Sequence, residues 1–308
     1  MKAINEKRVS YLYEAVTLGT VRAAADKLNV APSAVSRQIA LLEDELAMTL
    51  IERHRKGVTV TEAGELVLRY YRESLANEED CVAKLQALKG LQRGHIQLAV
   101  GEGFVGDLMA GPLPEFHRHY PQITVGITTA GSNEVVRMVE SDEAHIGLLF
   151  QPGNHPGIRS QVISRQPTCV IVHPEHALVT LAEEKGAVSL QQLLAYPVAL
   201  PESHFGVRQL LAMVEFREQF RFTPVMTSNS IAVLKHFVRA DMGITLLPEF
   251  VVAAEIADQQ LVALPVDHSL LASGEAHMIT RLGRHLSAGP HKLLQHLTAW
   301  MRAFRPAG

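Results

Sequence analysis

One stretch, from Thr20 to Lys56, constrains the fold of this chain more than any other part of its sequence. Thr20 is a suitable N-cap for a short helix over residues 21–28, and Asn29 tolerates the left-handed backbone angles of a sharp turn. Pro32 suits the first turn of a second helix, where its missing N–H costs nothing. The stretch therefore predicts two helices joined by a tight turn, an arrangement that can place one helix in the major groove of DNA.

The register of the second helix separates buried positions from exposed ones. Val35, Ile39 and Leu42 recur at spacings of four and three residues and predict a buried stripe. The polar side chains outside this stripe lie mostly in the first half of the helix, which is the part of a recognition helix that reaches base edges. Hydroxyl and guanidinium groups there can bond bases or phosphates. We expect the DNA contacts of this region to be Thr20, Pro32, Ser33, Ser36, Arg37 and Gln38.

A basic loop follows this helix and ends at Gly57. Arg53, Arg55 and Lys56 supply its positive charge, and residues 58–60 alternate as in a short strand. A winged helix-turn-helix has this order, and its basic wing holds the DNA backbone or enters the minor groove. A helical hairpin with a solvated basic loop is the alternative interpretation.

Residues 8–65 resemble the DNA-binding domain of LysR-type transcriptional regulators. The differences from the family pattern are conservative, and none falls on an expected DNA contact. Tyr13, Val21 and Ile51 stand where that family usually has Phe, and Ala47 where it usually has Gly. The matching residues form one ordered set: Ala23, Ala24, Leu28, Val30, Ser33, Ala34, Val35, Ser36, Arg37, Gln38, Ile39, Leu42, Glu43, Leu46, Leu50, Arg53, Thr61, Glu62, Ala63 and Gly64.

A long helix is expected next. Thr61 can cap it, no proline occurs from Val58 to Leu91, and Gly90 is a good stop signal. The resemblance implies that this linker helix pairs antiparallel with that of another subunit, and that the protein is a homotetramer of paired dimers. A helix packed on its own domain is the alternative. We therefore expect a DNA-binding domain over residues 1–60, a linker over 61–90 and an effector-binding domain over 91–308.

From His95 onward, strand and helix patterns alternate, which predicts an α/β domain of parallel sheets. The resemblance implies a two-lobed, periplasmic-binding-protein-like effector domain in which the chain crosses between the lobes near Ser164 and Asp267. Lobe I is then expected over about 91–163 and 268–308, and lobe II over about 164–267. The strands are expected at 95–101, 123–128, 146–150, 168–172, 197–200, 223–227, 245–247 and 276–280. The main helices are expected at 108–119, 133–140, 190–194, 207–220, 230–240 and 291–302.

In open α/β sheets, ligands bind at the carboxyl ends of strands beside helix N-termini. The backbone N–H groups and hydroxyls there favour an anion such as a carboxylate, and Arg208 is a candidate countercharge. Glu102 would oppose an anion, so a ligand with an amine or hydroxyl stays open, and the hydroxyl and amide side chains could instead only cap helices. The expected effector contacts are Glu102, Gly103, Phe104, Thr129, Ser132, Asn133, Pro201, His204, Phe205, Asn229 and Ser230.

Composition sets the remaining limits. The net charge of −3 over 308 residues means that any DNA-binding surface is local. No apolar run reaches about 18 residues, and the N-terminus lacks the apolar core of a signal peptide. Cys81 and Cys169 form no metal or redox motif, so we expect reduced thiols and a cytoplasmic protein without membrane contact.

No catalytic motif, phosphate loop, cofactor fingerprint or metal-ligand set occurs in the sequence. We therefore expect no enzyme, no cofactor and no metal. The leading hypothesis is a regulator that binds double-stranded promoter DNA and responds to a small-molecule effector. The alternatives are a small-solute-binding protein without transcriptional switching and a constitutive DNA-binding regulator with no effector.

Overall fold

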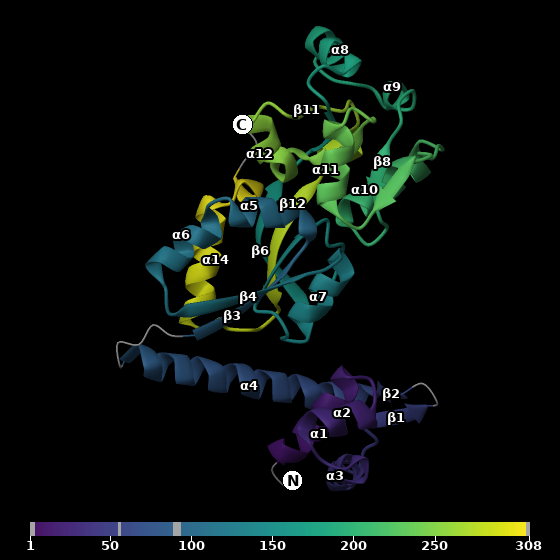
Figure 1. Cartoon of the computed structure of the whole chain (residues 1–308). Coiled ribbons are helices and arrows are strands. Elements are labelled where there is room, and N and C mark those ends of the chain that lie inside the picture. The colour runs from purple at the N-terminus through teal and green to yellow at the C-terminus, as the bar shows by residue number, and fades with distance from the viewer. Residues whose placement is uncertain (1–3, 55–56, 89–93, 306–308) are drawn as a thin grey trace. The chain divides into compact units, whose positions relative to one another are not determined.

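The computed structural model describes residues 4–54, 57–88 and 94–305 (Figure 1). The chain divides into two compact units, Met1–Cys81 and Val82–Gly308. The predicted wing residues Arg55 and Lys56 lie outside the described residues. The boundaries expected at residues 60 and 90 stay predictions.

The first unit is a winged helix-turn-helix. The side chain of Asn5 caps its first helix. As predicted, Thr20 caps the second helix, Asn29 turns the chain at a φ of 55°, and Pro32 opens α3. The wing is an antiparallel pair in which Ile51 lies opposite Val60. The elements are α1 (Glu6–Thr17), α2 (Val21–Leu28), α3 (Pro32–Leu46), β1 (Ile51–His54), β2 (Gly57–Val60) and α4 (Glu62–Leu88).

One apolar core holds these helices together. Val35, Ile39 and Leu42 are fully buried, which confirms the predicted stripe of α3. They pack with Leu12 of α1 and Ala24 of α2 in a single cluster. Because alanine is small, α3 can cross α2 closely, and the exposed side of α3 is fixed by this packing.

The second unit contains a five-stranded sheet in the order β4-β3-β5-β12-β6. The helix α7 packs against β3, β5 and β12, while α14 packs against β3 and α6. We call this sheet with its helices the first lobe. Its elements are β3 (Gly94–Val100), η1 (Glu102–Phe104), α5 (Val105–Met109), α6 (Pro112–His119), β4 (Ile123–Thr129), α7 (Ser132–Glu140), β5 (Ile146–Phe150), β6 (Ile158–Arg165), β12 (Glu275–Arg281), α14 (Ala288–Trp300) and η3 (Arg302–Phe304).

The chain leaves the first lobe after β6 and returns with β12. Between them lie a three-stranded sheet, β10-β7-β11, and a two-stranded sheet, β8-β9, joined by a bridge between Val198 and Ile244. We call these sheets with their helices the second lobe. Its elements are β7 (Thr168–Val172), α8 (Ala177–Lys185), α9 (Leu190–Leu193), β8 (Ala199–Pro201), α10 (Gly206–Arg217), β9 (Met226–Ser228), α11 (Ile231–Arg239), β10 (Thr245–Pro248), η2 (Glu249–Val252), α12 (Ala253–Ala257), β11 (Val262–Leu264) and α13 (Ser269–Ala272).

The expected parallel pairing occurs in part of each lobe, and the sheets are mixed. β3 pairs parallel with β4 and β5, and β8 with β9, but β12, β10 and β11 all run antiparallel to their neighbours. These strands return the chain to a sheet that earlier segments began, and a local pattern does not encode their direction. The helix expected over 108–119 is also two helices, because α5 ends before Gly111 and Pro112 starts α6.

None of the helices that the structure describes is long and apolar enough to cross a membrane.

Candidate functional site

The N-terminal half of α3 presents polar groups away from its buried stripe. Pro32, Ser33 and Arg37 are exposed, and Ser36 and Gln38 are partly exposed. Thr20 lies elsewhere, at the start of α2, where its Oγ1 accepts the Ala23 N–H at 3.1 Å. The geometry thus groups the residues expected on α3 on one accessible side and gives Thr20 a capping role.

The wing contacts the recognition helix directly. Arg53 of β1 donates from Nη1 to the Ser36 Oγ at 3.3 Å, and Arg53 itself is exposed. This bond brings two of the predicted DNA contacts together although 17 residues separate them. A phosphate placed near this pair would meet a guanidinium and a hydroxyl.

The acidic end of α3 has a structural role that the sequence reasoning missed. Glu43 accepts the backbone N–H groups of Leu50 (2.7 Å) and Ile51 (3.2 Å), so it ties the end of α3 to the first wing strand. Glu45 forms an ion pair with Arg8 of α1. The partners of Glu43 are backbone N–H groups beyond the next turn, which the sequence does not identify. The available signal was the presence of an acidic residue near the end of the helix.

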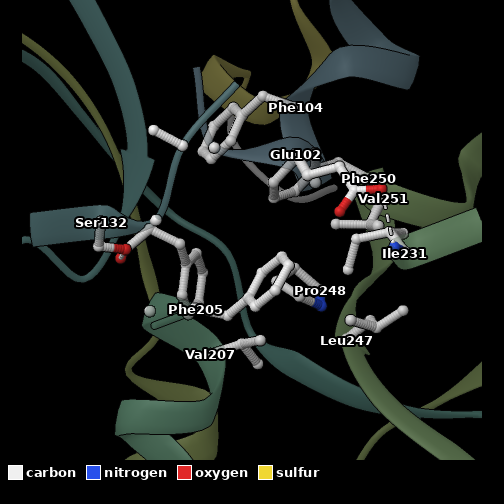
Figure 2. Close-up of a pocket in the computed structure, with 16 residues that line it drawn as sticks. Glu102, Phe104, Ser132, Phe205, Val207, Ile231, Leu247, Pro248, Phe250 and Val251 are labelled. Carbon is white, nitrogen blue, oxygen red and sulfur yellow. Dashed lines mark hydrogen bonds between the residues drawn. The ribbon is translucent and has the colours of Figure 1, made fainter. Parts of the chain in front are cut away.

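In the second unit, a cavity lies between the two lobes (Figure 2). Its volume is about 40 Å³, and one water needs roughly 10–15 Å³ on this scale, so a few waters fill it. The cleft is therefore closed too tightly for a metabolite. Its lining is Gly101, Glu102, Gly103, Phe104, Ala130, Gly131, Ser132, Phe150, Phe205, Gly206, Val207, Ile231, Leu247, Pro248, Phe250 and Val251.

The structure brings part of the predicted effector set together at this cavity. The predicted residues that line it are Glu102, Gly103, Phe104, Ser132 and Phe205. The predicted residues outside its lining are Thr129, Asn133, Pro201, His204, Asn229 and Ser230. Of this second group, Pro201 is buried in β8, and Thr129, Asn133, His204 and Asn229 are exposed.

Two of these outer residues still touch the cleft through hydrogen bonds. Ser230 donates its hydroxyl to the Glu102 Oε1 at 3.2 Å. The His204 carbonyl accepts the backbone N–H of Ser132 at 3.0 Å, which closes the start of α7 with an atom of the second lobe. The Ser132 hydroxyl in turn lies 3.4 Å from the Phe150 carbonyl oxygen.

Sequence reasoning missed the lining that comes from η2 and from the start of α10. Phe250 packs against Phe104 with ring centroids 5.0 Å apart and ring planes tilted by 47°, which makes one wall of the cavity aromatic. Gly206 opens α10 where any Cβ would overlap the Phe150 carbonyl oxygen. Its place directly after the predicted Phe205 was the available signal, because a glycine at a helix start permits close backbone approach.

Arg208 is not a free countercharge for a ligand. Its Nη1 donates to the Glu215 Oε2 at 2.9 Å, about two turns further along α10. Glu215 is buried and also accepts the Phe222 N–H, so the pair anchors the end of α10. Arg208 is thus paired with Glu215 within α10 and is not among the residues that line the cavity.

Cys169 lies buried on β7 of the second lobe. Burial raises the pKa of the Cys169 thiol to about 12, so it stays protonated at neutral pH. Among the described residues, no three His, Cys, Asp or Glu side chains gather in a way that could hold a metal ion.

The geometry defines a class of protein: a winged helix-turn-helix joined to a two-lobed domain with a cleft, as in ligand-responsive DNA-binding proteins. Residues 7–65 match the profile of the bacterial regulatory helix-turn-helix protein, lysR family, and residues 89–302 match that of the LysR substrate binding domain. The chain belongs to the LysR family of transcriptional regulators.

Known regulators support this assignment over most of the chain. The RuBisCO operon transcriptional regulator of Allochromatium vinosum is 28% identical over 269 residues, which covers 86% of this chain and 85% of that protein. The regulator CfxR of Cupriavidus necator is 29% identical and covers 79% of this chain and 75% of its own.

Solved structures share the fold. Full-length OxyR from Pseudomonas aeruginosa, in a variant form, superposes with a TM-score of 0.69 at 17% identity and covers 99% of this chain and 98% of its own. ArgP from Mycobacterium tuberculosis reaches a TM-score of 0.66 at 20% identity, with all of both chains covered. These likenesses confirm the predicted fold class, with its two-lobed effector domain.

Proposed function

We propose that this regulator reads promoter DNA with the exposed side of α3 and its wing, and that a small molecule in the cleft changes this binding. The residues proposed to contact DNA are Ser33, Ser36, Arg37, Gln38 and Arg53, with Arg55 and Lys56 as further wing contacts. The observation that carries the proposal is the Arg53–Ser36 bond, because it aligns the wing with the reading side of α3. The cytoplasm, where promoter DNA lies, is the proposed location.

The test is binding of the full chain to the DNA upstream of its own gene, measured by fluorescence anisotropy at moderate salt. Arg37→Ala should weaken binding by about 1–3 kcal/mol, the usual value of a base-reading arginine. Arg221→Ala is the control, because Arg221 is an exposed arginine of the second lobe. Equal affinities for Arg37→Ala and the unaltered protein would reject the assignment of α3.

For the cleft, a thermal-shift screen of small metabolites identifies ligands, and each ligand is then tested for its effect on DNA binding. Ser132→Ala should weaken the response to a ligand and leave DNA binding in its absence unchanged, because Ser132 lines the cavity. Asn229→Ala tests whether the site extends beyond that lining. If no ligand changes DNA binding, the result would favour the alternative of a constitutive DNA-binding regulator without an effector.

The proposed assembly is a dimer or tetramer that presents two recognition helices to two half-sites. Apolar side chains on α4 support it, because Leu66, Tyr70, Leu75, Val82 and Leu85 are between 40% and 58% exposed. A helix with this many unburied apolar side chains has a surface suited to a second copy.

A further inference from the structure

Glu102 carries a carboxylate across the cleft. It lies in η1, directly after the first strand of the first lobe, and its Oε1 accepts the backbone N–H of Ile231 at 2.9 Å. The same oxygen accepts the Ser230 hydroxyl at 3.2 Å. Figure 2 shows the Glu102 side chain reaching Ile231, which begins α11 of the second lobe. The two residues are 129 positions apart in the sequence.

This contact supplies what α11 lacks locally. The first N–H groups of a helix have no partner within the helix, and the side chain of the N-cap Ser230 makes no capping bond to them. A carboxylate at a helix N-terminus is further favoured by the helix dipole. The group that caps α11 is therefore the Glu102 carboxylate of the opposite lobe. Its hydrogen bond to α11 exists only while the lobes are closed.

A second bond crosses the cleft beside it. The Ser132 N–H at the start of α7 in the first lobe donates to the His204 carbonyl of the second lobe at 3.0 Å. Gly131 permits this approach, because a Cβ there would meet His204 atoms at 2.9 Å. This bond joins two backbone groups and needs no particular side chain, whereas the bond to α11 depends on the carboxylate at position 102.

We propose that Glu102 is a latch that holds the two lobes closed without ligand. An effector can bind only when the hydrogen bonds of Glu102 to Ser230 and Ile231 break. The inference rests on the proposed effector function of the cleft. A cavity of about 40 Å³ holds only a few waters, so the lobes must move apart to accommodate a metabolite-sized ligand, and that separation breaks both bonds of Glu102. The latch sets the fraction of molecules competent to bind, and apparent affinity scales with that fraction.

The two crossing bonds give the proposal a test that a purely local helix cap fails. In the full chain, hydrogen–deuterium exchange is measured by mass spectrometry in the peptides that contain Ile231 and Ser132. For Glu102→Ala, exchange of both amides should accelerate about tenfold or more, the value expected for lost hydrogen bonds to a charged group. Acceleration at Ile231 alone would overturn the latch, because a local cap opens α11 without separating the lobes. Unchanged exchange at both amides would overturn it as well.

Chemical rescue makes the test specific to the carboxylate. Acetate can occupy the space that Glu102→Ala vacates and should slow exchange at Ile231 in this variant. Acetate should not change exchange at Ile231 in the unaltered protein. If acetate slowed exchange at Ile231 equally in both proteins, the result would count against the latch. Glu102→Gln keeps an acceptor oxygen without charge, so it should accelerate the same two amides less than Glu102→Ala. Glu184→Ala, an exposed glutamate of α8, is the matched control and should change neither amide.

These readouts need neither an effector nor DNA, so they separate the latch from the proposed function. A latch confirmed by exchange, together with a cleft that answers no ligand, would reject the effector function alone. A ligand response with no change of exchange in Glu102→Ala would reject the latch alone.

Discussion

At the scale of single residues, the fold depends on a few places where chain segments approach closely. Gly64, in the first turns of α4, is such a place, because a Cβ there would overlap the Leu50 carbonyl oxygen. That carbonyl accepts the Thr61 N–H at 3.0 Å, so the backbone cannot retreat without losing a bond. The start of α4 and the start of the wing are therefore packed backbone to backbone.

Gly64→Ala should destabilise the first unit by about 1–3 kcal/mol, the usual cost of overpacking. Chemical denaturation followed by circular dichroism measures the loss. Gly94→Ala is the control, because no atom lies within 4 Å of a Cβ at that position. Equal stabilities of the two variants would contradict the close packing at position 64.

His277 makes stability depend on pH. It is buried on β12, with Nδ1 2.9 Å from the Ser160 Oγ and Nε2 3.2 Å from a Glu275 oxygen. Burial lowers the pKa of His277 below 6.5, although the Glu275 carboxylate acts in the opposite direction. The folded state thus resists protonation, while the unfolded state takes up a proton near pH 6.5.

As pH falls below about 6.5, the unfolded state binds more protons than the folded state, so stability should fall. This loss continues until pH reaches the lowered folded pKa of His277. His277→Gln should reduce the slope of unfolding free energy against pH from about pH 6.5 down to the lowered folded pKa of His277. An unaltered slope in that variant would show that other groups cause the pH dependence.

At the scale of elements, sequence-based prediction succeeded where the signals are local. Thr20, Asn29 and Pro32 fixed the bounds of α2 and the start of α3, because a cap, a left-handed turn residue and a proline each act within one turn. The strand β6 was missed, because polar and apolar side chains do not alternate regularly over its residues Ile158–Arg165, which lie at the edge of a sheet. It pairs with β12, over a hundred residues later, and the local sequence of β6 does not predict this long-range pairing.

The predicted cleft residues show the same difference between local and long-range signals. The rule that strand ends meet helix starts found Glu102, Ser132 and Phe205, which all line the cavity. It could not find Phe250 and Val251, because their approach depends on how one lobe closes on the other. The same rule could not predict that the Glu102 carboxylate accepts a hydrogen bond from the start of α11 in the other lobe.

The linker helix α4 gives a prediction about assembly. Val82→Glu with Leu85→Glu should shift the protein toward monomer, because charges replace apolar side chains that are 46% and 55% exposed. Analytical ultracentrifugation measures the shift, and Lys185→Glu on α8 is the control. An unchanged sedimentation coefficient would place the subunit interface elsewhere than on this part of α4.

At the scale of the whole molecule, charge is segregated. The chain carries a net charge of −3, yet the expected DNA-binding surface is basic through Arg37 and the wing. Of the acidic groups at the end of α3, Glu43 accepts backbone N–H groups and Glu45 pairs with Arg8, while Asp44 is exposed. The exposed Arg37 and Arg53 supply local positive charge for phosphates, although the protein as a whole is mildly acidic.

The salt dependence of DNA binding should report this segregation. Each phosphate contact contributes about 0.9 to the slope of log affinity against log salt, so Arg53→Ala should lower that slope by about 0.9. Arg239→Ala, an exposed arginine of the second lobe, should leave the slope unchanged. Titrations between about 50 and 200 mM salt measure both. Equal slopes for Arg53→Ala and the unaltered protein would remove Arg53 from the backbone contacts.

The proposed latch has a consequence for the kinetics of ligand capture. If the lobes must separate before the small cavity accommodates a ligand, the observed association rate should rise with ligand concentration and then level off at the rate of opening. A cell that raises its effector concentration beyond that point gains occupancy but no speed. The regulator would then respond to how long a metabolite persists, and brief surges shorter than the opening time would leave transcription unchanged.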